Sequence, residues 1–163
     1  MKKTAIICSF NTIKSKRIAD IILKNLGEDK AELVNAEELI AEKFLSYKKA
    51  ILSTPTWFCG ELPNYWDEFM PAIEDEDLSG HTYMIYGLGD QKKYPWNFVD
   101  AIRMMAEFLE ERGATLEGFV KNEGYNFKES KALRPDGMFY GLPLDDDNEA
   151  EKTDERVAGW LAK

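Results

Sequence analysis

Short apolar runs alternate with amphipathic runs along the whole chain. Residues 4–8 (TAIIC) and 49–53 (KAILS) are largely apolar, which is typical of strands in a parallel sheet that helices cover on both faces. Further strands are predicted at 31–34 and 82–86, and a fifth from 115 that is interrupted by a polar stretch at 121–137 and then resumes. The amphipathic runs predict helices at 15–26, 36–43, 64–75, 97–112 and 149–162.

This alternation of strand and helix predicts an α/β fold. We expect a doubly wound, five-stranded parallel sheet flanked by helices in three layers. No linker or internal repeat divides the sequence, so we expect a single domain over 1–163. In such sheets, ligands bind beyond the carboxyl ends of the strands. Three segments leave those ends: the first loop (9–14), the second loop (54–62) and the third loop (87–97).

Composition narrows the range of partners. The chain of 163 residues carries a net charge of -9, which disfavours nucleic acid and anionic membranes and suits a basic protein surface. The N-terminal apolar run is too short for a signal peptide or a membrane span and is interpreted as a strand. The two cysteines, Cys8 and Cys59, suggest neither a zinc site nor a disulfide framework. We expect a cytoplasmic monomer.

The second and third loops are rich in aromatic residues. Trp57 and Tyr94 lie beside loop glycines, and two rings from different loops can enclose a flat ligand. For Trp96 and Phe98 we favour packing against the core. The sequence therefore predicts a site for a planar conjugated molecule between Trp57 and Tyr94.

Several stretches resemble one known family. PTWFCGELPNYWDEFMP and YGLGDQKKYPWNFVDA resemble the two flavin-contacting loops of flavodoxins, and GLPLDDDNEAEKTDERVAGWL matches the family further on. The resemblance covers nearly the whole chain, and the residues after Val120 look like the insertion of long-chain flavodoxins. It implies a flavodoxin-like fold and a low-potential one-electron carrier that binds FMN non-covalently, rather than an enzyme with catalytic or metal-binding residues.

The resemblance also implies where FMN is held. It places the flavin ring between Trp57 and Tyr94, and its pyrimidine edge against the backbone N–H groups of Gly89, Asp90 and Gln91. The implied cofactor-binding residues are, in the first loop and the turn after it, Ser9, Phe10, Asn11, Thr12, Ile13, Lys14 and Ser15; in the second loop, Thr54, Pro55, Thr56, Trp57, Phe58, Cys59 and Gly60; and in the third, Leu88, Gly89, Asp90, Tyr94 and Trp96.

The first loop departs from the family pattern. Thr12 and Ser15 match, but Phe10 replaces a hydroxyl residue and Ile13 replaces glycine. If that glycine position needs a positive φ, Ile13 would be strained by more than about 1 kcal/mol. We therefore expect either weakened FMN binding or loss of the phosphate site.

Loss of the phosphate site leaves two alternatives open. The cleft would take another planar ligand, such as haem or a bilin, with Phe10 and Ile13 widening its apolar wall and with reductase activity on that ligand. In this alternative His81, expected as a surface or turn histidine, lies at the wrong end of its strand to bind the iron. Otherwise the protein would be an interaction protein with a vestigial site.

Acidic residues form two clusters. In flavodoxins such faces surround the exposed flavin edge and meet basic reductases and acceptors, so we expect redox partner proteins with basic surfaces. For the first cluster we favour docking, and the second is interpreted as a solvated face. They comprise Asp67, Glu68, Glu74, Asp75, Glu76 and Asp77, and then Asp145, Asp146, Asp147, Glu149 and Glu151.

Overall fold

The computed structural model describes residues 2–163. Six strands are formed: β1 (Thr4–Cys8), β2 (Ala31–Asn35), β3 (Lys49–Ser53), β4 (Thr82–Leu88), β5 (Thr115–Leu116) and β6 (Leu142–Leu144). The α-helices are α1 (Ile13–Leu26), α2 (Ala41–Leu45), α3 (Asn64–Phe69), α4 (Ala101–Glu111) and α5 (Asp146–Leu161). Two 3₁₀ turns, η1 (Ala36–Glu38) and η2 (Met70–Ile73), complete the described elements.

All strand pairings in the sheet are parallel, and the order is β2-β1-β3-β4-β5. β6 also pairs with β4, next to Tyr86–Leu88, whereas β5 pairs with Thr82 and Tyr83. The fifth strand is therefore split by the loop over residues 117–141, as the interrupted apolar pattern predicts. Gly141 permits the chain to return to the sheet, since a Cβ there would overlap the carbonyl oxygen of Ile85.

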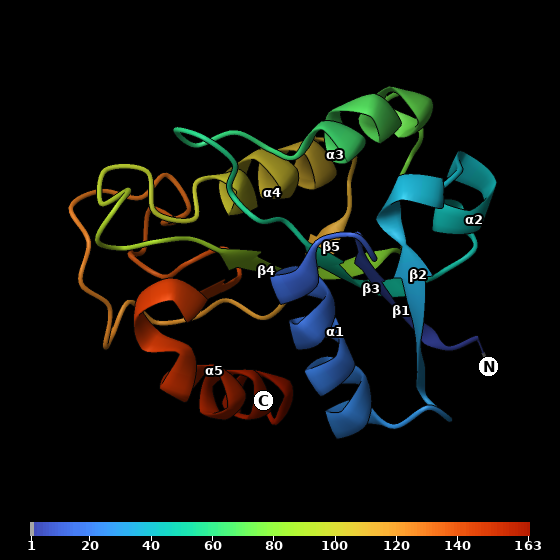
Figure 1. The fold of residues 1–163 in the computed structure, drawn as a ribbon. Helices are drawn as coiled ribbons and strands as arrows, with labels where there is room; N and C mark the ends of the chain where they lie inside the picture. Colours follow the sequence, from blue (N-terminus) through green and yellow to red (C-terminus); the bar gives the residue numbers. More distant parts are fainter. Residues whose placement is uncertain (1) are drawn as a thin grey trace.

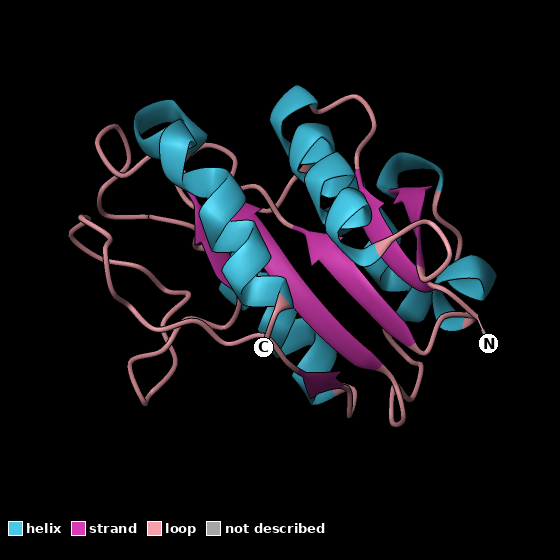
Figure 2. Cartoon of the chain, turned by 90° about the horizontal axis from the view of Figure 1, so that it is seen from below, coloured by secondary structure: helices cyan, strands magenta, loops and turns pink. Residues whose placement is uncertain are grey.

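The helices cover both faces of the sheet, which confirms the three-layer prediction. Figure 1 shows α1 and α5 on one side of the strands and α3 and α4 on the other. Ile18 and Ile22 of α1 pack with Val157 and Trp160 of α5 in one apolar cluster, and the helices of the opposite face build a second, larger cluster. Figure 2 looks from the side of α1 and α5 and shows both helices in front of the sheet, running roughly along the strands.

Several predictions made from the sequence need correction. The helix expected at 64–75 ends as α3 at Phe69 and continues as the 3₁₀ turn η2. The helix expected at 36–43 is divided into η1 and α2, because Leu39 and Ile40 are extended and the Asn35 side chain caps η1 by accepting from Glu37 N. The helix expected from 97 begins only at Ala101, after a turn in which Val99 has φ 50°.

A further correction concerns His81. It closes a turn, as predicted, with its N–H donating to Leu78 O at 3.0 Å, but its side chain is buried rather than at the surface. Its Nδ1 lies 2.9 Å from the carbonyl oxygen of Tyr47. It stands before β4, at the edge of the sheet opposite the three loops, as the sequence predicts. Cys8 is a core residue, and burial raises the pKa of its thiol to about 12.

No helix within residues 2–163 has the length and apolar character needed to cross a membrane.

Candidate functional site

The three loops meet at the carboxyl edge of the sheet. The pairing of β3 with β4 continues beyond β3, because Thr54 N donates to Tyr86 O at 2.9 Å and Thr56 N donates to Leu88 O at 3.0 Å. A cavity of about 260 Å³ opens here, between the loops and the start of α5. Its lining residues are Lys14, Pro55, Thr56, Leu88, Gly89, Asp90, Lys93, Tyr94 and Asp147.

The first loop leads into an α-helix whose N-terminus has no side-chain cap. Thr12 is the extended N-cap residue, its side chain makes no capping hydrogen bond, and the first turn of α1 contains no acidic residue. The hydroxyl groups of Ser15 and Thr54 are buried and have no hydrogen-bond partner within residues 2–163. Tyr86 adjoins both residues, since its hydroxyl donates to Ser15 O at 3.0 Å and its carbonyl accepts from Thr54 N. Helix N–H groups and buried, partnerless hydroxyls are the donors that a phosphate accepts from.

The rest of the first loop is hydrogen-bonded to the end of β2 and the segment after it. Ser9 Oγ and Asn11 Nδ2 both donate to the Glu37 carboxylate, the latter at 3.0 Å, and Phe10 N donates to Asn35 Oδ1 at 3.3 Å. Hydrogen bonds from Ser9 and Asn11 lower the pKa of Glu37. Ser9 and Asn11 therefore support the loop rather than offering free donors.

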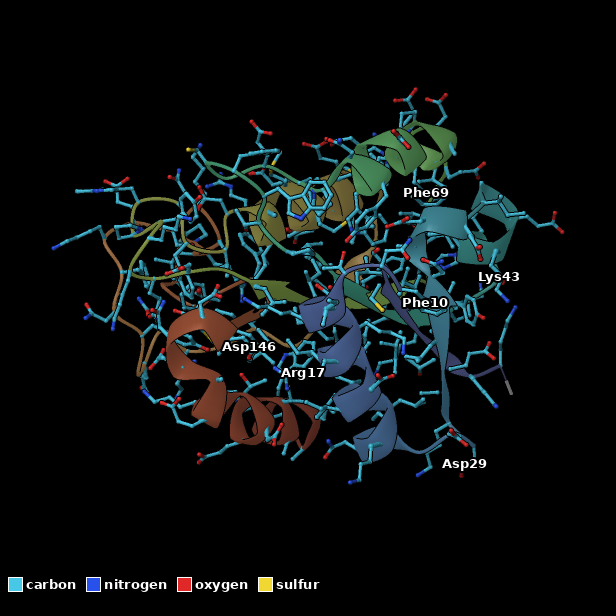
Figure 3. All side chains as sticks on the ribbon, viewed as in Figure 1. Phe10, Arg17, Asp29, Lys43, Phe69 and Asp146 are labelled. Atoms are coloured by element: carbon cyan, nitrogen blue, oxygen red, sulfur yellow. The ribbon has the colours of Figure 1, made fainter. Side chains whose placement is uncertain are left out.

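The structure answers the concern about Phe10 and Ile13. Ile13 is the first residue of α1, is not among the residues with positive φ, and its exposure is 85%. Phe10, at 42% exposure, lines a separate groove beside β2, and Figure 3 shows it on the β2 side of α1. The expected backbone strain at Ile13 is therefore absent, and neither side chain widens the cavity wall, as the haem alternative required.

The second loop is a tight turn packed against the start of α4. Trp57 and Glu61 exchange two backbone hydrogen bonds of 2.8 Å, with Phe58 and Gly60 at φ 51° and 99° between them. A Cβ at Gly60 would lie 3.0 Å from Asp100 Oδ2. Thr56 Oγ1 accepts from Ala101 N at 3.1 Å and so caps α4. The loop is thus held from two sides, and Phe58 and Cys59 face outward.

Within the third loop, the Asp90 carboxylate organises the turn that leads to Tyr94. Asp90 Oδ1 accepts from the N–H groups of Lys92 and Lys93 at 3.0 and 2.9 Å, and Asp90 O accepts from Tyr94 N at 2.9 Å. Burial raises the pKa of Asp90, but the hydrogen bonds from Lys93 N and Asn148 outweigh it, so the pKa is lowered. Asp90 is therefore ionised at neutral pH and shapes the turn that carries Tyr94.

Two N–H groups expected to face the flavin edge are used inside the protein. Gly89 N donates to Leu144 O at 3.0 Å, and Gln91 N donates to Asp145 Oδ2 at 3.0 Å. Gln91 is buried, so its side of the loop turns toward α5 and away from the cavity.

The aromatic side chains divide between cavity, core and surface. Tyr94 lines the cavity, whereas Trp57, in the adjoining loop, is outside the lining and stands edge-on to Tyr65, with ring centroids 6.0 Å apart. Phe98 is buried as expected. Trp96 is 59% exposed, which contradicts the expectation of a core residue, because the turn before α4 points it outward.

Sequence reasoning missed the role of residues 145–149. They lie at the start of α5, and Asp145 is fully buried, with its side chain accepting from Asn148 N as the N-cap. The interpretation of this stretch as a solvated face is therefore wrong for Asp145 and for Asp146, whose side chain is 5% exposed. An Asp directly after the apolar strand Leu142–Leu144 was the available signal, since Asp is a preferred N-cap residue. Within residues 2–163, no three His, Cys, Asp or Glu side chains are grouped to hold a metal ion.

Comparisons with known proteins agree with this architecture. The family model described as Flavodoxin matches residues 11–160. The chain is 39% identical to the flavodoxin of Klebsiella pneumoniae, over 99% of this chain and 96% of the relative, and 37% identical to flavodoxin 1 of Escherichia coli K12, over 99% and 92%. The crystal structure of Fusobacterium nucleatum flavodoxin bound to flavin mononucleotide superimposes with a TM-score of 0.92 at 27% identity, covering 99% of this chain and 96% of that one. A family match over most of the chain and identity above one third along nearly its full length establish descent: the chain belongs to the flavodoxin family.

Proposed function

We propose that this protein binds FMN non-covalently at the carboxyl edge of its sheet and carries single electrons between partner proteins. The single observation that carries the proposal is a pair of buried, partnerless hydroxyls, that of Ser15 in the uncapped first turn of α1 and that of Thr54, the first residue after β3. A buried polar group without a partner costs stability, and a bound phosphate would satisfy both hydroxyls. The FMN-bound structures of Fusobacterium nucleatum flavodoxin support the choice of ligand.

The residues present fit FMN in two parts. Thr12, Ser15 and Thr54, with the N–H groups of the first turn of α1, would hold the phosphate. Tyr94 and the cavity beside it would hold part of the ring. At about 260 Å³ the cavity is slightly smaller than the roughly 300–1,000 Å³ of ordinary ligand pockets, so we expect the ring to extend along the second loop, where Trp57 is available.

Bound FMN supplies the redox chemistry, accepting and releasing electrons one at a time. The protein contributes position and environment. Tyr94 offers an aromatic face, Pro55 and Leu88 exclude water, and the ionised Asp90 sets a negative potential beside the cavity.

The haem or bilin alternative has no supporting observation. Its apolar wall is missing, as Phe10 and Ile13 point elsewhere. Among the side chains that bind haem iron, the residues that line the cavity include only Tyr94, and no His, Cys or Met.

A paired titration tests the proposal. Ser15→Ala should lower FMN affinity by about tenfold or more, the factor expected for one hydrogen bond to a charged group, and should leave riboflavin affinity unchanged. The same variant should not lower the stability of the ligand-free protein, because it removes a partnerless buried hydroxyl and introduces a better helix former. Flavin fluorescence quenching gives the affinities, and urea unfolding gives the stability.

Two results would contradict the proposal. One is wild-type protein that binds neither flavin at millimolar concentration. The other is equal wild-type affinity for FMN and riboflavin, which would show that the first loop takes no phosphate.

We further propose that the partners present basic surfaces. The acidic residues on and after α3 are all exposed, and the second loop leads directly into that helix. Reversing the charge of Glu68 with Glu68→Lys should slow electron transfer to a basic flavodoxin reductase and flatten its salt dependence, whereas Asp29→Lys, beyond the end of α1, serves as the control. Stopped-flow rates at several salt concentrations measure both, and equal effects of the two variants would refute docking at α3.

A cytoplasmic location is proposed as well, since Cys59 is an exposed free thiol, which suits a reducing compartment.

A further inference from the structure

We propose that residues 145–149, at the start of α5, act on both ends of the cofactor site. Asn148 positions the turn of the third loop that presents Tyr94, and Asp147 holds Lys14, so that the phosphate must compete with a carboxylate for the cation of the first loop. The inference rests on the proposed FMN function and deepens it by assigning positioning residues outside the three loops.

The segment is itself firmly anchored. Asp145 is fully buried, with Oδ1 accepting from Asn148 N at 3.0 Å and Oδ2 accepting from Gln91 N and Nε2 at 3.0 and 2.9 Å. Asp146 pairs with Arg17 of α1 and accepts from Thr153 Oγ1 at 2.5 Å. Figure 3 shows Arg17 and Asp146 facing each other between α1 and α5. These contacts hold the segment against both α1 and the third loop.

A kink separates this turn from the rest of α5. Glu149 has non-helical backbone angles, φ −136° and ψ 40°. Its Oε1 accepts from Gln91 Nε2 at 2.6 Å and from Arg156 Nη2 at 3.2 Å. Burial raises the pKa of Glu149, but hydrogen bonds from Lys152 and Gln91 and the charge of Arg156 outweigh it, so the group stays ionised. The kink lets residues 146–148 face the cofactor loops while the helix beyond it packs on the sheet.

One side chain of the segment, that of Asn148, contacts the third loop. Asn148 Nδ2 donates to Asp90 Oδ1 at 2.7 Å, the same oxygen that accepts from Lys92 N and Lys93 N. Asp90 O in turn accepts from Tyr94 N. Asn148 therefore acts on the ring end of the site through Asp90, without lining the cavity itself.

A second side chain of the segment, that of Asp147, contacts the first loop. Lys14 and Asp147 form an ion pair, and both line the cavity with Tyr94. Both side chains are about half exposed, so the pair adds little to folding stability. Its effect is local: the carboxylate neutralises the one cation that the first loop contributes to the cavity.

Because Asn148 contacts the third loop and Asp147 contacts the first, we predict that substitutions at the two residues affect different ligands. Asn148→Ala should weaken riboflavin and FMN binding by the same factor, about tenfold, and leave inorganic phosphate binding unchanged. Asp147→Asn should strengthen inorganic phosphate and FMN binding about threefold and leave riboflavin unchanged, because it frees Lys14 and removes a negative charge. Matched controls are Asn122→Ala, in the 117–141 loop, and Asp154→Asn, an exposed acid further along α5.

A double-mutant cycle separates positioning from simple destabilisation. If Asn148 acts through Asp90, Asn148→Ala should have no further effect on riboflavin affinity in an Asp90→Ala background. Flavin titrations by fluorescence quenching and phosphate titrations by calorimetry supply the affinities. Additive effects of the two substitutions, or variants indistinguishable from their controls while wild type binds FMN, would overturn the inference. Failure of wild type to bind either flavin would instead refute the proposed function.

Discussion

Ile13 shows how far a single residue can be judged from a family pattern. An isoleucine where relatives of the chain are expected to have glycine suggests strain, because β-branched residues avoid positive φ. In the structure the residue opens α1 with helical geometry and directs its side chain into solvent. A helix start demands no special backbone conformation, so the position tolerates a side chain.

The substitution Ile13→Gly tests this directly. We expect stability to fall by about 0.5 kcal/mol, because glycine is the poorer helix former, and FMN affinity to change by less than about threefold. Urea unfolding and flavin titration measure the two effects, with Ile13→Ala as the control for loss of the side chain. Relief of strain would do the opposite, raising stability by about 1 kcal/mol or more and tightening FMN binding.

At the scale of elements, the split fifth strand determines where residues 145–149 lie. β5 and β6 each pair with β4 over two or three residues, and residues 117–141 leave and rejoin the sheet between them. β6 leads straight into Asp145, so the short strand sets the position of the segment that holds Gln91. The return depends on Gly141, whose missing Cβ lets the chain pass the backbone of β4.

Gly141→Ala should therefore destabilise the protein by about 3 kcal/mol, since a methyl group there meets backbone atoms that cannot move aside. Gly159→Ala is the matched control, because a Cβ at this α5 position meets nothing within 4 Å and should stabilise the helix by about 0.5–1 kcal/mol. Thermal and urea unfolding compare them. A Gly141→Ala variant as stable as wild type would mean that β6 is not held as close to β4 as described.

For the whole molecule, which has a net charge of -9, the acidic residues fall into two groups with different roles. The acids on and after α3 are exposed, whereas Asp90, Asp145 and Glu149 are tied into the site by hydrogen bonds. Acidic residues thus serve both as surface charge and as structural acceptors, and protonation should affect the two groups differently.

Acid should unfold the protein partly through Asp90 and Glu149. Both have pKa values lowered from ordinary values of 3.8 and 4.5, so the folded state binds fewer protons than the unfolded state. Their contribution is complete above the ordinary values and is lost as pH falls through the lowered ones, so stability should decline between about pH 5 and pH 3. Urea unfolding across this range in about 0.5 M salt, which screens general repulsion, measures the slope. Glu149→Gln should flatten that slope, and an unchanged slope would contradict this assignment.

Much of the fold was accessible from local patterns. The buried strands at 4–8 and 49–53, the division of the fifth strand and the meeting of the three loops at the carboxyl edge follow from apolar runs and the alternation of elements, which are properties of neighbouring residues. The late start of α4 did not follow, because Thr56, a side chain distant in sequence, caps Ala101 N. The break between η1 and α2 has local causes, the extended Leu39 and Ile40 and the Asn35 cap, which the apolar pattern does not record.

The sequence by itself determined the layered α/β fold, the three loops and the family of this protein, because periodicity and motif spacing record which residues are buried and which face the site. Only the tertiary structure decided the roles of Ile13, Gln91 and the acids at 145–149. A carboxylate on the surface and one that caps a helix and holds a loop look alike in a sequence, and their difference arises from groups that folding brings together across up to 133 residues of chain, as in the pair of Lys14 and Asp147.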